Sequence, residues 1–263
     1  MPSFNKTISS PEDFDPDAFS QAAIALQIAP ELEHSGTVHS HRKGQLIVSL
    51  HGAVSCEVKD AIWLVPPQHA VWIPSSTSHS VRITKNASTC FLFIEPSAIA
   101  MPSSCCTLYI SPLIKELIQH LAAQDPAYQA ESKTSRLANV LLEHLSDAPL
   151  KDLHLPISDH PKIKQLTNAL FAYPDDRTTL RQWAERLATS ERSLARLVKS
   201  ATGLSFGRWR QQLHLMIALS QLAEGQSVQN VAGNLGYDSV NAFITMFKKA
   251  LGKSPTQYFA SLR

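Results

Sequence analysis

The chain has 263 residues, of which 44% are hydrophobic and 17% are charged. This length allows two domains of ordinary size, and the composition is that of a globular protein, which excludes a disordered chain. The acidic N-terminal segment has no apolar core, so it is not a secretory signal, and no run approaches the ~18 apolar residues of a membrane span. We therefore expect a cytoplasmic protein with no membrane partner.

The net charge of +2 is divided unevenly along the chain. Residues 1–160 contain 10 Lys and Arg against 16 Asp and Glu, a charge of −6, whereas residues 161–263 contain 14 against 6, a charge of +8. A basic C-terminal third joined to an acidic body indicates a module that binds a polyanion. Chance variation of the surface is the weaker explanation.

The region that follows the N-terminal segment has the pattern of a β-domain. Residues 36–96 contain six short runs rich in Val, Ile and aromatic residues: LIVSL, AVSCEV, AIWLV, AVWI, SVRIT and CFLFI. Gly, Pro, Ser, Asp or Asn separates successive runs. Short strands at this close spacing predict an antiparallel barrel or sandwich.

The four cysteines are Cys56, Cys90, Cys105 and Cys106. Their spacing does not fit a zinc site, because no CxxC occurs. In a reducing compartment we expect free thiols, some of them buried.

The periodicity becomes helical from Ser111. Ser111 is expected to cap a helix that begins at Pro112, and a second helix is expected over about 132–146. The apolar stripe of this helical hairpin either packs on the barrel or pairs with a second subunit. In the second case the protein is a homodimer, and charged substitutions at Leu117 or Leu141 should give folded monomers.

The C-terminal third begins after a linker. Three prolines and little periodicity indicate that residues 148–161 are this linker. A helix over about 180–187, a short turn and a second helix capped by Ser190 then have the arrangement of a helix-turn-helix. This arrangement places side chains of its second helix against base edges in the major groove of DNA.

The helix-turn-helix pattern occurs a second time, with helices over 228–234 and about 239–251. A single helix of about 18 residues separates the two motifs. Its length of ~27 Å allows two recognition helices to lie in adjacent major-groove segments, which are ~34 Å apart.

Residues from about 162 to 263 resemble the DNA-binding domain of AraC/XylS-type bacterial transcription regulators. The diagnostic pattern of that family is matched by Ala232, Gly236, Tyr237, Ser239, Phe243, Phe247, Lys248, Gly252, Ser254, Pro255 and Tyr258. Phe259 departs from the pattern, because Arg is usual there, and this puts a surface or phosphate contact in doubt but not the fold. The resemblance implies a regulator whose partners are double-stranded DNA and RNA polymerase.

The resemblance also implies which residues contact DNA, since residues early in each second helix face the bases in this family. The expected contacts are Ser190, Arg192, Ser193, Arg196, Arg208, Ser239, Val240, Asn241, Thr245, Lys248 and Lys249. Arginine binds guanine and asparagine binds adenine, whereas Arg208, Lys248 and Lys249 suit phosphates. For each residue a solvated helix face is the alternative.

Regulators of this family commonly carry an effector-sensing and dimerising barrel, and residues 36–96 are similar to a cupin. His39, His41, Gln45, Gly52 and His79 follow the cupin pattern, with Gln45 where metal-binding cupins have Glu. Residues i and i+2 of a strand share a face, so His39 and His41 should meet His79 inside the barrel. The expected effector residues are therefore His39, His41, Gln45 and His79.

Two ligands fit these residues. Three imidazoles, those of His39, His41 and His79, can hold a divalent transition metal such as Zn, Ni or Fe as a cofactor. The second possible ligand is an organic effector that hydrogen-bonds to the same histidines. Ordinary polar positions in a sealed barrel are the third interpretation.

Together these patterns predict an α+β multidomain protein. A cupin-like antiparallel β-barrel (1–105) is followed by a helical hairpin for dimerisation (106–147), the linker (148–161) and an all-α DNA-binding domain with two helix-turn-helix units (162–263). The leading hypothesis is a regulator, not an enzyme, that is switched by a small molecule or metal. A cupin-type metalloenzyme with an accessory DNA-binding tail and a constitutive architectural DNA binder are the alternatives.

Overall fold

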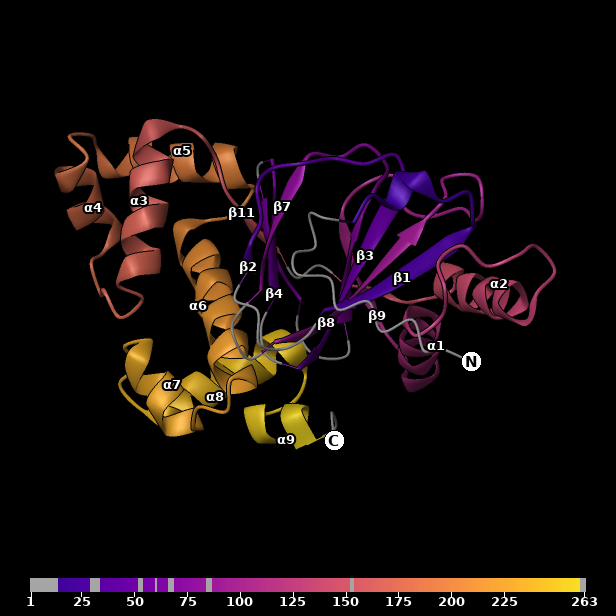
Figure 1. Ribbon diagram of the computed structural model, residues 1–263. Coiled ribbons are helices and arrows are strands. Elements are labelled where there is room, and N and C mark those ends of the chain that lie inside the picture. Colours follow the sequence, from indigo (N-terminus) through magenta and orange to yellow (C-terminus); the bar gives the residue numbers. More distant parts are fainter. Residues whose placement is uncertain are drawn as a thin grey trace. The chain divides into compact units, whose positions relative to one another are not determined.

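The computed structural model of the protein describes residues 14–28, 34–51, 54–59, 61–65, 69–83, 87–151 and 154–260. Gly52 and residues 1–13, on which parts of the sequence predictions rest, lie outside the described residues. The chain forms two compact units, an N-terminal unit of Met1–Lys59 with Trp63–Leu153 and a C-terminal unit of Asp60–Ile62 with His154–Arg263 (Figure 1). Within the described ranges, no helix is long and apolar enough to cross a membrane.

The N-terminal unit is built on two β-sheets, preceded by a short 3-10 helix, η2 (Pro16–Ala18). The first sheet is antiparallel throughout and contains, in spatial order, β1 (Ala23–Ile28), β8 (Ser88–Ile94), β3 (Gly44–His51), β6 (His69–Ile73), β9 (Cys106–Tyr109) and β10 (Leu150–Lys151). The second contains β5 (Ala61–Val65), β4 (Val54–Val58), β7 (His79–Ile83) and β2 (His34–Ser35). The six runs predicted from the sequence form β3 to β8, and the predicted β-rich fold is confirmed.

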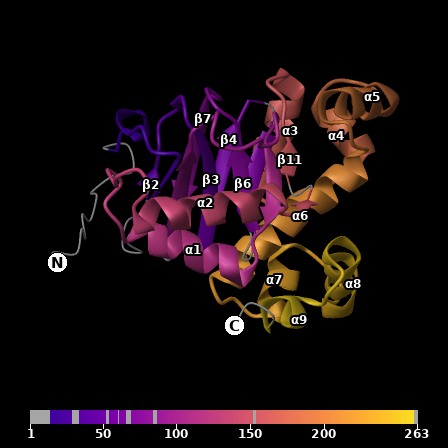
Figure 2. The ribbon, with the colours of Figure 1, turned by 90° about the vertical axis from the view of Figure 1, so that its right-hand side faces the viewer.

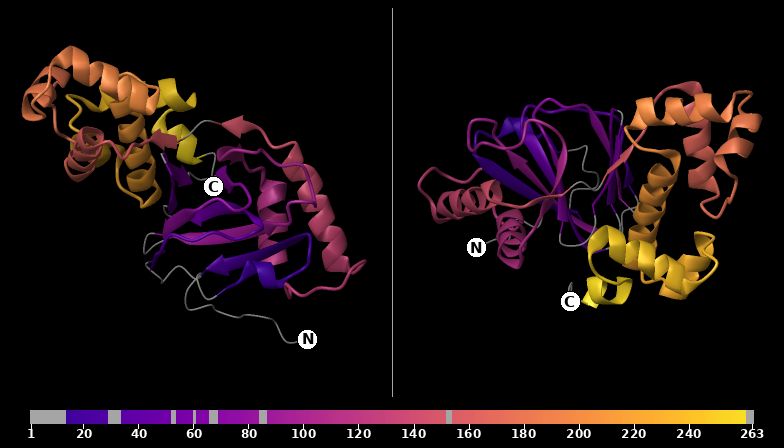
Figure 3. Two further views of the ribbon diagram at one scale, coloured as in Figure 1. Left: turned by 90° about the horizontal axis from the view of Figure 1, so that it is seen from above. Right: turned by 180° about the vertical axis from the view of Figure 1, so that it is seen from behind.

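Two helices cover the outer face of the first sheet, as Figures 2 and 3 show. They are α1 (Pro112–Ala122), capped by Ser111, and α2 (Lys133–Ser146), capped by Ser132, so both predicted helices are confirmed. Their apolar stripes pack with alternate residues of the strands in one buried cluster, to which Leu46, Leu92, Ile118 and Leu141 belong. Successive strand residues point to opposite faces, so Gln45 and Ile47 face the second sheet instead.

Gly44 is the first residue of β3, and a larger residue would not fit there. A Cβ atom on Gly44 would lie 2.1 Å from the indole of Trp72 on the neighbouring strand β6. The indole is held in place by a 2.8 Å hydrogen bond from its Nε1 to the carbonyl of Pro102. This close packing fixes the start of β3, and therefore the position of Gln45.

The C-terminal unit is helical apart from β11 (His154–Pro156). Its helices are α3 (Pro161–Ala172), α4 (Leu180–Arg186), α5 (Glu191–Thr202), α6 (Phe206–Ala223), α7 (Val228–Asn234), α8 (Val240–Leu251) and α9 (Pro255–Ala260). Helices α4 and α5 form the first helix-turn-helix motif and α7 and α8 the second, with the 18-residue helix α6 between them. The all-α domain with two motifs predicted from the sequence is therefore confirmed.

Local signals explain why these helices begin and end where they do. Serine side chains at the N-caps of α5 and α8, Ser190 and Ser239, accept hydrogen bonds from backbone N–H groups of the first turn. Both helices end at a glycine in the left-handed conformation, Gly203 and Gly252. Trp209 of α6, which is 1% exposed, donates from its indole nitrogen to the carbonyl of Pro156 at 2.8 Å and anchors the helix in the unit.

Some elements had not been predicted. Strand β1 contains two alanines and β9 has only four residues, so neither gives a strong β-pattern. Strand β9 lies within the range assigned to the helical hairpin, and β10 and β11 lie within the range assigned to the linker. All four cysteines are free and Cys56 and Cys90 are buried, as expected.

Candidate functional sites

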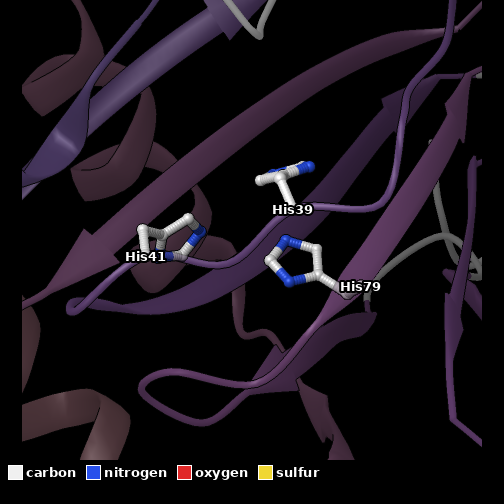
Figure 4. A group of neighbouring side chains, drawn as sticks. All are labelled: His39, His41 and His79. Carbon is white, nitrogen blue, oxygen red and sulfur yellow. The ribbon is translucent and has the colours of Figure 1, made fainter.

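The three histidines of the sequence motif lie together in the N-terminal unit (Figure 4). His39 pairs with His79, the first residue of β7, through two backbone hydrogen bonds of 2.9 Å, and His41 follows two residues later. The ring of His79 lies 4.4 Å from that of His39 and 5.2 Å from that of His41, measured between centroids. One nitrogen from each ring lies within 4.8 Å of the other two. We call these three residues the histidine cluster.

Each imidazole of the histidine cluster is anchored at Nδ1 by a backbone carbonyl. The distances are 3.0 Å from His39 to Thr37, 2.5 Å from His41 to Lys43 and 2.8 Å from His79 to Thr77. A carbonyl oxygen can only accept a hydrogen bond, so Nδ1 carries the proton in each contact. In a neutral ring Nε2 then keeps its lone pair, and this is the atom free to bind a metal or accept a hydrogen bond.

Gln45 of β3 joins two rings of the cluster. Its amide oxygen Oε1 lies 3.1 Å from His41 Nε2 and 2.7 Å from His79 Nε2, and the residue is buried. Two lone pairs cannot attract each other, so an oxygen in this place requires both rings to be protonated at Nε2 as well as at Nδ1. Turning the amide by 180° instead directs one N–H of Gln45 to each Nε2 and suits two neutral rings.

Burial decides between these two arrangements at His79. Burial lowers the pKa of His79 to about 4, although a hydrogen bond with the carbonyl of Thr77 opposes the shift, and the neighbouring His39 and His41 add to it. His79 is therefore neutral at neutral pH. With its Nδ1 proton donated to Thr77, its Nε2 must accept, so the amide nitrogen of Gln45 faces it.

The histidine cluster lies at the edge of the N-terminal unit's interior and not wholly inside it. His79 is buried, His41 is half-buried and His39 is exposed. The expectation of three histidines inside a barrel is therefore wrong for His39. His39 lies in the segment that follows β2 and pairs with β7 through its backbone, but its side chain is on the solvent side.

A pocket of about 370 Å³ opens next to the cluster. His39, His41 and Gln45 form part of its wall, whereas His79 lies behind Gln45. The remaining wall is partly apolar, from Phe14, Val81, Phe91 and Phe93, and partly polar, from Asp15, Asp17, Thr37 and Ser40. Apolar walls with a few converging polar groups are the usual composition of a small-molecule site.

A charged network that the sequence did not reveal supports one side of this pocket. Lys43 is fully buried, and its Nζ lies 2.8 Å from Glu95 and donates to the carbonyl of Gln21 at 3.0 Å. Arg42 also pairs with Glu95. Hydrogen bonds from Arg42 and Lys43 lower the pKa of Glu95. A buried ammonium needs such a partner, so the segment between His41 and Gln45 is held firmly.

The Asp17 carboxylate connects this network to the segment that precedes β1. It accepts hydrogen bonds from the backbone N–H groups of Arg42 at 2.6 Å and Lys43 at 3.1 Å. Burial opposes ionisation, but these hydrogen bonds prevail and lower the pKa of Asp17. Asp17 also lines the pocket, so the 14–19 segment closes one of its sides.

The donor set fits a first-row transition metal in part. Three imidazole nitrogens bound tetrahedrally at 2.0–2.1 Å are about 3.4 Å apart, so the rings would need to approach one another by at most about 1.4 Å. The Nδ1 contacts are the outer contacts that hold metal-binding histidines. Gln45 is neutral and is a weaker ligand than a carboxylate.

The expected DNA-contacting residues lie on and next to the two second helices, α5 and α8. Arg192, Arg196, Asn241, Lys248 and Lys249 are exposed. Arg208 is exposed at the start of α6, and Ser193 and Val240 are half-buried. The Thr245 hydroxyl donates to the carbonyl of Asn241 at 2.8 Å, and the Ser190 and Ser239 hydroxyls cap their helices.

Both parts of the chain match known protein families. The AraC-like ligand binding domain matches residues 21–145, and the Helix-turn-helix domain matches residues 183–261. A β-rich ligand-binding domain followed by a double helix-turn-helix defines an AraC-type transcription regulator. The chain belongs to this family of HTH-type transcriptional regulators.

One relative is similar to this chain over nearly its whole length. The chain is 52% identical over 255 residues to the HTH-type transcriptional regulator NimR of Escherichia coli K12, which covers 95% of this chain and 92% of NimR. It is 29% identical over 103 residues to the regulator RipA of Corynebacterium glutamicum, covering 39% of this chain and 31% of RipA. The crystal structure of ToxT from Vibrio cholerae O395 aligns with 91% of this chain and 97% of its own, with 10% identity and a TM-score of 0.40.

Proposed function

We propose that this AraC-type regulator reads two adjacent major-groove segments of double-stranded DNA and is switched by a ligand bound at the histidine cluster. The proposal rests on one observation above all: the imidazoles of His41 and His79 and the amide of Gln45 converge beside a pocket. His41 and Gln45 line this pocket, and a few polar groups among apolar walls are the usual composition of a small-molecule site. The protein acts by binding and carries out no reaction, in the cytoplasm.

The ligand is a small organic molecule in the first instance. A pocket of about 370 Å³ holds a compact molecule, and its phenylalanine side chains suit a flat apolar body. His39 offers Nε2 to a donor of the ligand, and His41 can do so where the ligand displaces the amide of Gln45. The site therefore fits a molecule with hydrogen-bonding groups at one end.

A divalent transition metal is the second candidate, and the three Nδ1 contacts favour it. They fix the same tautomer in all three rings, so that His39, His41 and His79 each have their lone pair on Nε2, the atom that would bind an ion. A bound ion would displace the Gln45 amide from His41 and His79. The chemistry supplied by the ion would be structural, because it would order the pocket wall.

Thermal unfolding of the full-length protein distinguishes these ligands. ZnCl₂, NiCl₂, CoCl₂ and a library of small organic molecules are each added to the wild type and to a His41→Ala/His79→Ala variant. A ligand of this site raises the unfolding temperature of the wild type and not that of the variant. If every ligand that stabilises the wild type stabilises the variant equally, the site is not at the histidine cluster.

In the C-terminal unit, we assign base contacts to Arg192, Ser193 and Arg196 in the first motif and to Val240, Asn241 and Thr245 in the second. Phosphate contacts are assigned to Arg208, Lys248 and Lys249, with Ser190 and Ser239 at the helix N-termini. Exposure of the three arginines, two lysines and Asn241 supports these roles.

We further propose that the protein is a homodimer and acts on RNA polymerase. The expectation that Leu141 lies in the dimer interface is wrong, because Leu141 is 0% exposed and packs inside the N-terminal unit. Leu117 is half-buried against the same cluster. Leu113 of α1 and Val140 of α2 are 51% and 43% exposed, so these are the apolar side chains that a partner subunit can cover.

A further inference from the structure

The two helix-turn-helix motifs are joined by a contact that does not involve the covalent connection through α6. The loop between α3 and α4, residues 173–179, lies against the turn between α7 and α8, residues 235–239 (Figure 1). We call these the 173–179 loop and the α7–α8 turn. The residues that meet are about 60 positions apart in the chain. The 173–179 loop leads into the first motif, and the α7–α8 turn is part of the second.

Gly236 forms the tightest part of this contact. Its φ is +71°, and a Cβ atom built on it would lie 2.8 Å from the carbonyl oxygen and 3.0 Å from the Cα of Asp175. Both neighbouring atoms are backbone atoms, which cannot turn aside as a flexible side chain could. Only glycine therefore allows the 173–179 loop and the α7–α8 turn to approach this closely.

Arg177 holds the loop to the turn, and Arg210 holds the loop to α6. Arg177 donates from Nη2 to the carbonyl of Gly236 at 2.7 Å, and its Nη1 lies 2.5 Å from the Asp238 carboxylate. Arg210 of α6 donates to the carbonyls of Asp176 and Thr178, the second at 3.2 Å. Planar guanidinium groups suit such paired contacts, and an ammonium cannot reproduce both.

Tyr237 ties the α7–α8 turn to the helices on either side. Its ring centroid lies 5.6 Å from that of His214 on α6 and 5.6 Å from that of Phe243 on α8. Its hydroxyl lies 3.4 Å from Nδ1 of His214. The turn is therefore held by the loop on one side and by the connecting helix on the other.

Apart from this contact, α7 and α8 are attached to the first motif through their packing on α6 and through the chain at the end of α6. The chain turns there at Gly225, whose φ is +88° and whose Cβ position is open. A change of a few degrees at such a turn would move the start of α8 relative to α5. The loop-to-turn contact removes this freedom.

We propose that Gly236, Arg177 and Arg210 are positioning residues that set the distance and angle between the recognition helices α5 and α8. The two motifs then read DNA as one rigid body and accept one spacing between the two base-pair segments. This inference rests on the proposed function, since it assumes that both motifs bind DNA together. It adds that a contact between the motifs, and not the length of α6 alone, determines the spacing between the two base-pair segments.

The test uses the full-length protein and a DNA site selected by the wild type from a random pool. Binding is measured to this site and to the same site with one base pair inserted between the two protected segments. One inserted base pair moves the second segment by about 3.4 Å and rotates it by about 35°. We expect the insertion to weaken wild-type binding roughly tenfold or more.

Gly236→Ala and Gly203→Ala form a matched pair for this test. Gly203 has a similar φ of +73° but nothing within 4 Å of its Cβ position, so both variants carry the same backbone strain and only Gly236→Ala separates the motifs. We expect the insertion to weaken DNA binding by Gly203→Ala as much as it weakens binding by the wild type. It should weaken binding by Gly236→Ala only about threefold or less; we call this loss of affinity the penalty. Equal penalties in the two variants would overturn the inference.

A second pair covers the case in which Gly236→Ala does not fold. Arg177→Lys/Arg210→Lys keeps both charges but loses the paired contacts, and Arg181→Lys is the control, because Arg181 pairs only with Glu185 of its own helix among the residues that the structure describes. The double variant should also show a reduced penalty, and an unchanged penalty would refute the inference. A wild type that selects no DNA site would instead contradict the proposed function.

Discussion

The Nε2 atom of His79 lies 2.7 Å from the side-chain amide of Gln45, and both residues are buried. Because His79 is neutral and donates from Nδ1 to Thr77, the amide must donate to it. Gln45 thus occupies the lone pair that a metal ion would need. A glutamate carboxylate at this place could only accept hydrogen bonds, so it would leave the Nε2 lone pair of His79 without a donor.

Replacing Gln45 with Glu is therefore expected to convert the histidine cluster into a stronger metal site. A carboxylate next to two imidazoles adds a charged ligand, so we expect the affinity for Ni²⁺ or Zn²⁺ to rise at least about tenfold. Titration calorimetry on the full-length protein measures this change. Gln27→Glu, an exposed position on β1, is the charge-matched control. Equal affinities in the two variants would show that Gln45 does not face the ligand atoms.

The C-terminal unit should lose stability in mild acid because of His214. Burial, and then the charge of Arg210, lower the pKa of His214 to about 4, although a hydrogen bond with the Pro174 backbone opposes the shift; the other facing titratable group is Tyr237. The unfolded chain, with an ordinary histidine pKa of about 6.5, binds the proton first. The free energy of unfolding therefore keeps its full value above about pH 6.5 and decreases as the pH falls towards 4, because protons bind the unfolded chain first.

Urea unfolding of the full-length protein, followed by tryptophan fluorescence, to which the buried Trp183 and Trp209 of the C-terminal unit contribute, measures this loss between pH 7 and pH 4.5. Over this range the free energy of unfolding of the wild type should decrease by up to about 3 kcal/mol more than that of His214→Gln. His160→Gln, an exposed histidine of the same unit, serves as the control. The same pH dependence in wild type and His214→Gln would contradict the prediction.

The proposed dimer can be tested on α1 and α2. Leu113→Glu and Val140→Glu introduce charge at exposed positions and should give folded monomers in sedimentation experiments at micromolar concentration. Leu141→Glu should unfold the N-terminal unit, because it places a carboxylate in the core. A wild type that is already monomeric would refute the dimer, and dimers of both surface variants would exclude this face.

Two substitutions separate base contacts from phosphate contacts. Arg196→Ala should cost ~1–3 kcal/mol of specific binding and relax the preference at one base pair. Lys248→Ala should weaken binding to all sequences alike and reduce the dependence on salt. Fluorescence anisotropy at several salt concentrations distinguishes the two effects. If Arg196→Ala binds the selected site as the wild type does, α5 does not present Arg196 to the bases.

Local patterns predicted most of the fold. The two helix-turn-helix motifs, the 18-residue α6 and the caps Ser111 and Ser190 depend on residues close together in the chain, and all were correct. Leu141 shows the limit of such patterns: an apolar stripe shows that a helix face is covered but not by what. The first sheet and α1 cover it here.

The residues that could not be predicted depend on partners distant in the chain. Lys43 is buried because its ammonium group pairs with Glu95, 52 residues away, and donates to the carbonyl of Gln21. No spacing in the sequence predicts these contacts. The role of Gly236 likewise depends on Asp175. The histidine cluster was found from the sequence because HxH and His79 follow a known order, but the Nδ1 contacts that orient the rings are made by backbone atoms.

The central claim is that ligand binding at the histidine cluster controls DNA binding, and one measurement tests it most directly. The affinity of full-length protein for its selected DNA site is measured with and without the compound or metal salt that most raises the wild-type unfolding temperature, for the wild type and for His41→Ala/His79→Ala. We predict that this ligand changes the wild-type affinity at least about fivefold, and that the variant binds DNA as the ligand-free wild type does and no longer responds. A variant that still responds to the ligand as the wild type does would contradict the account.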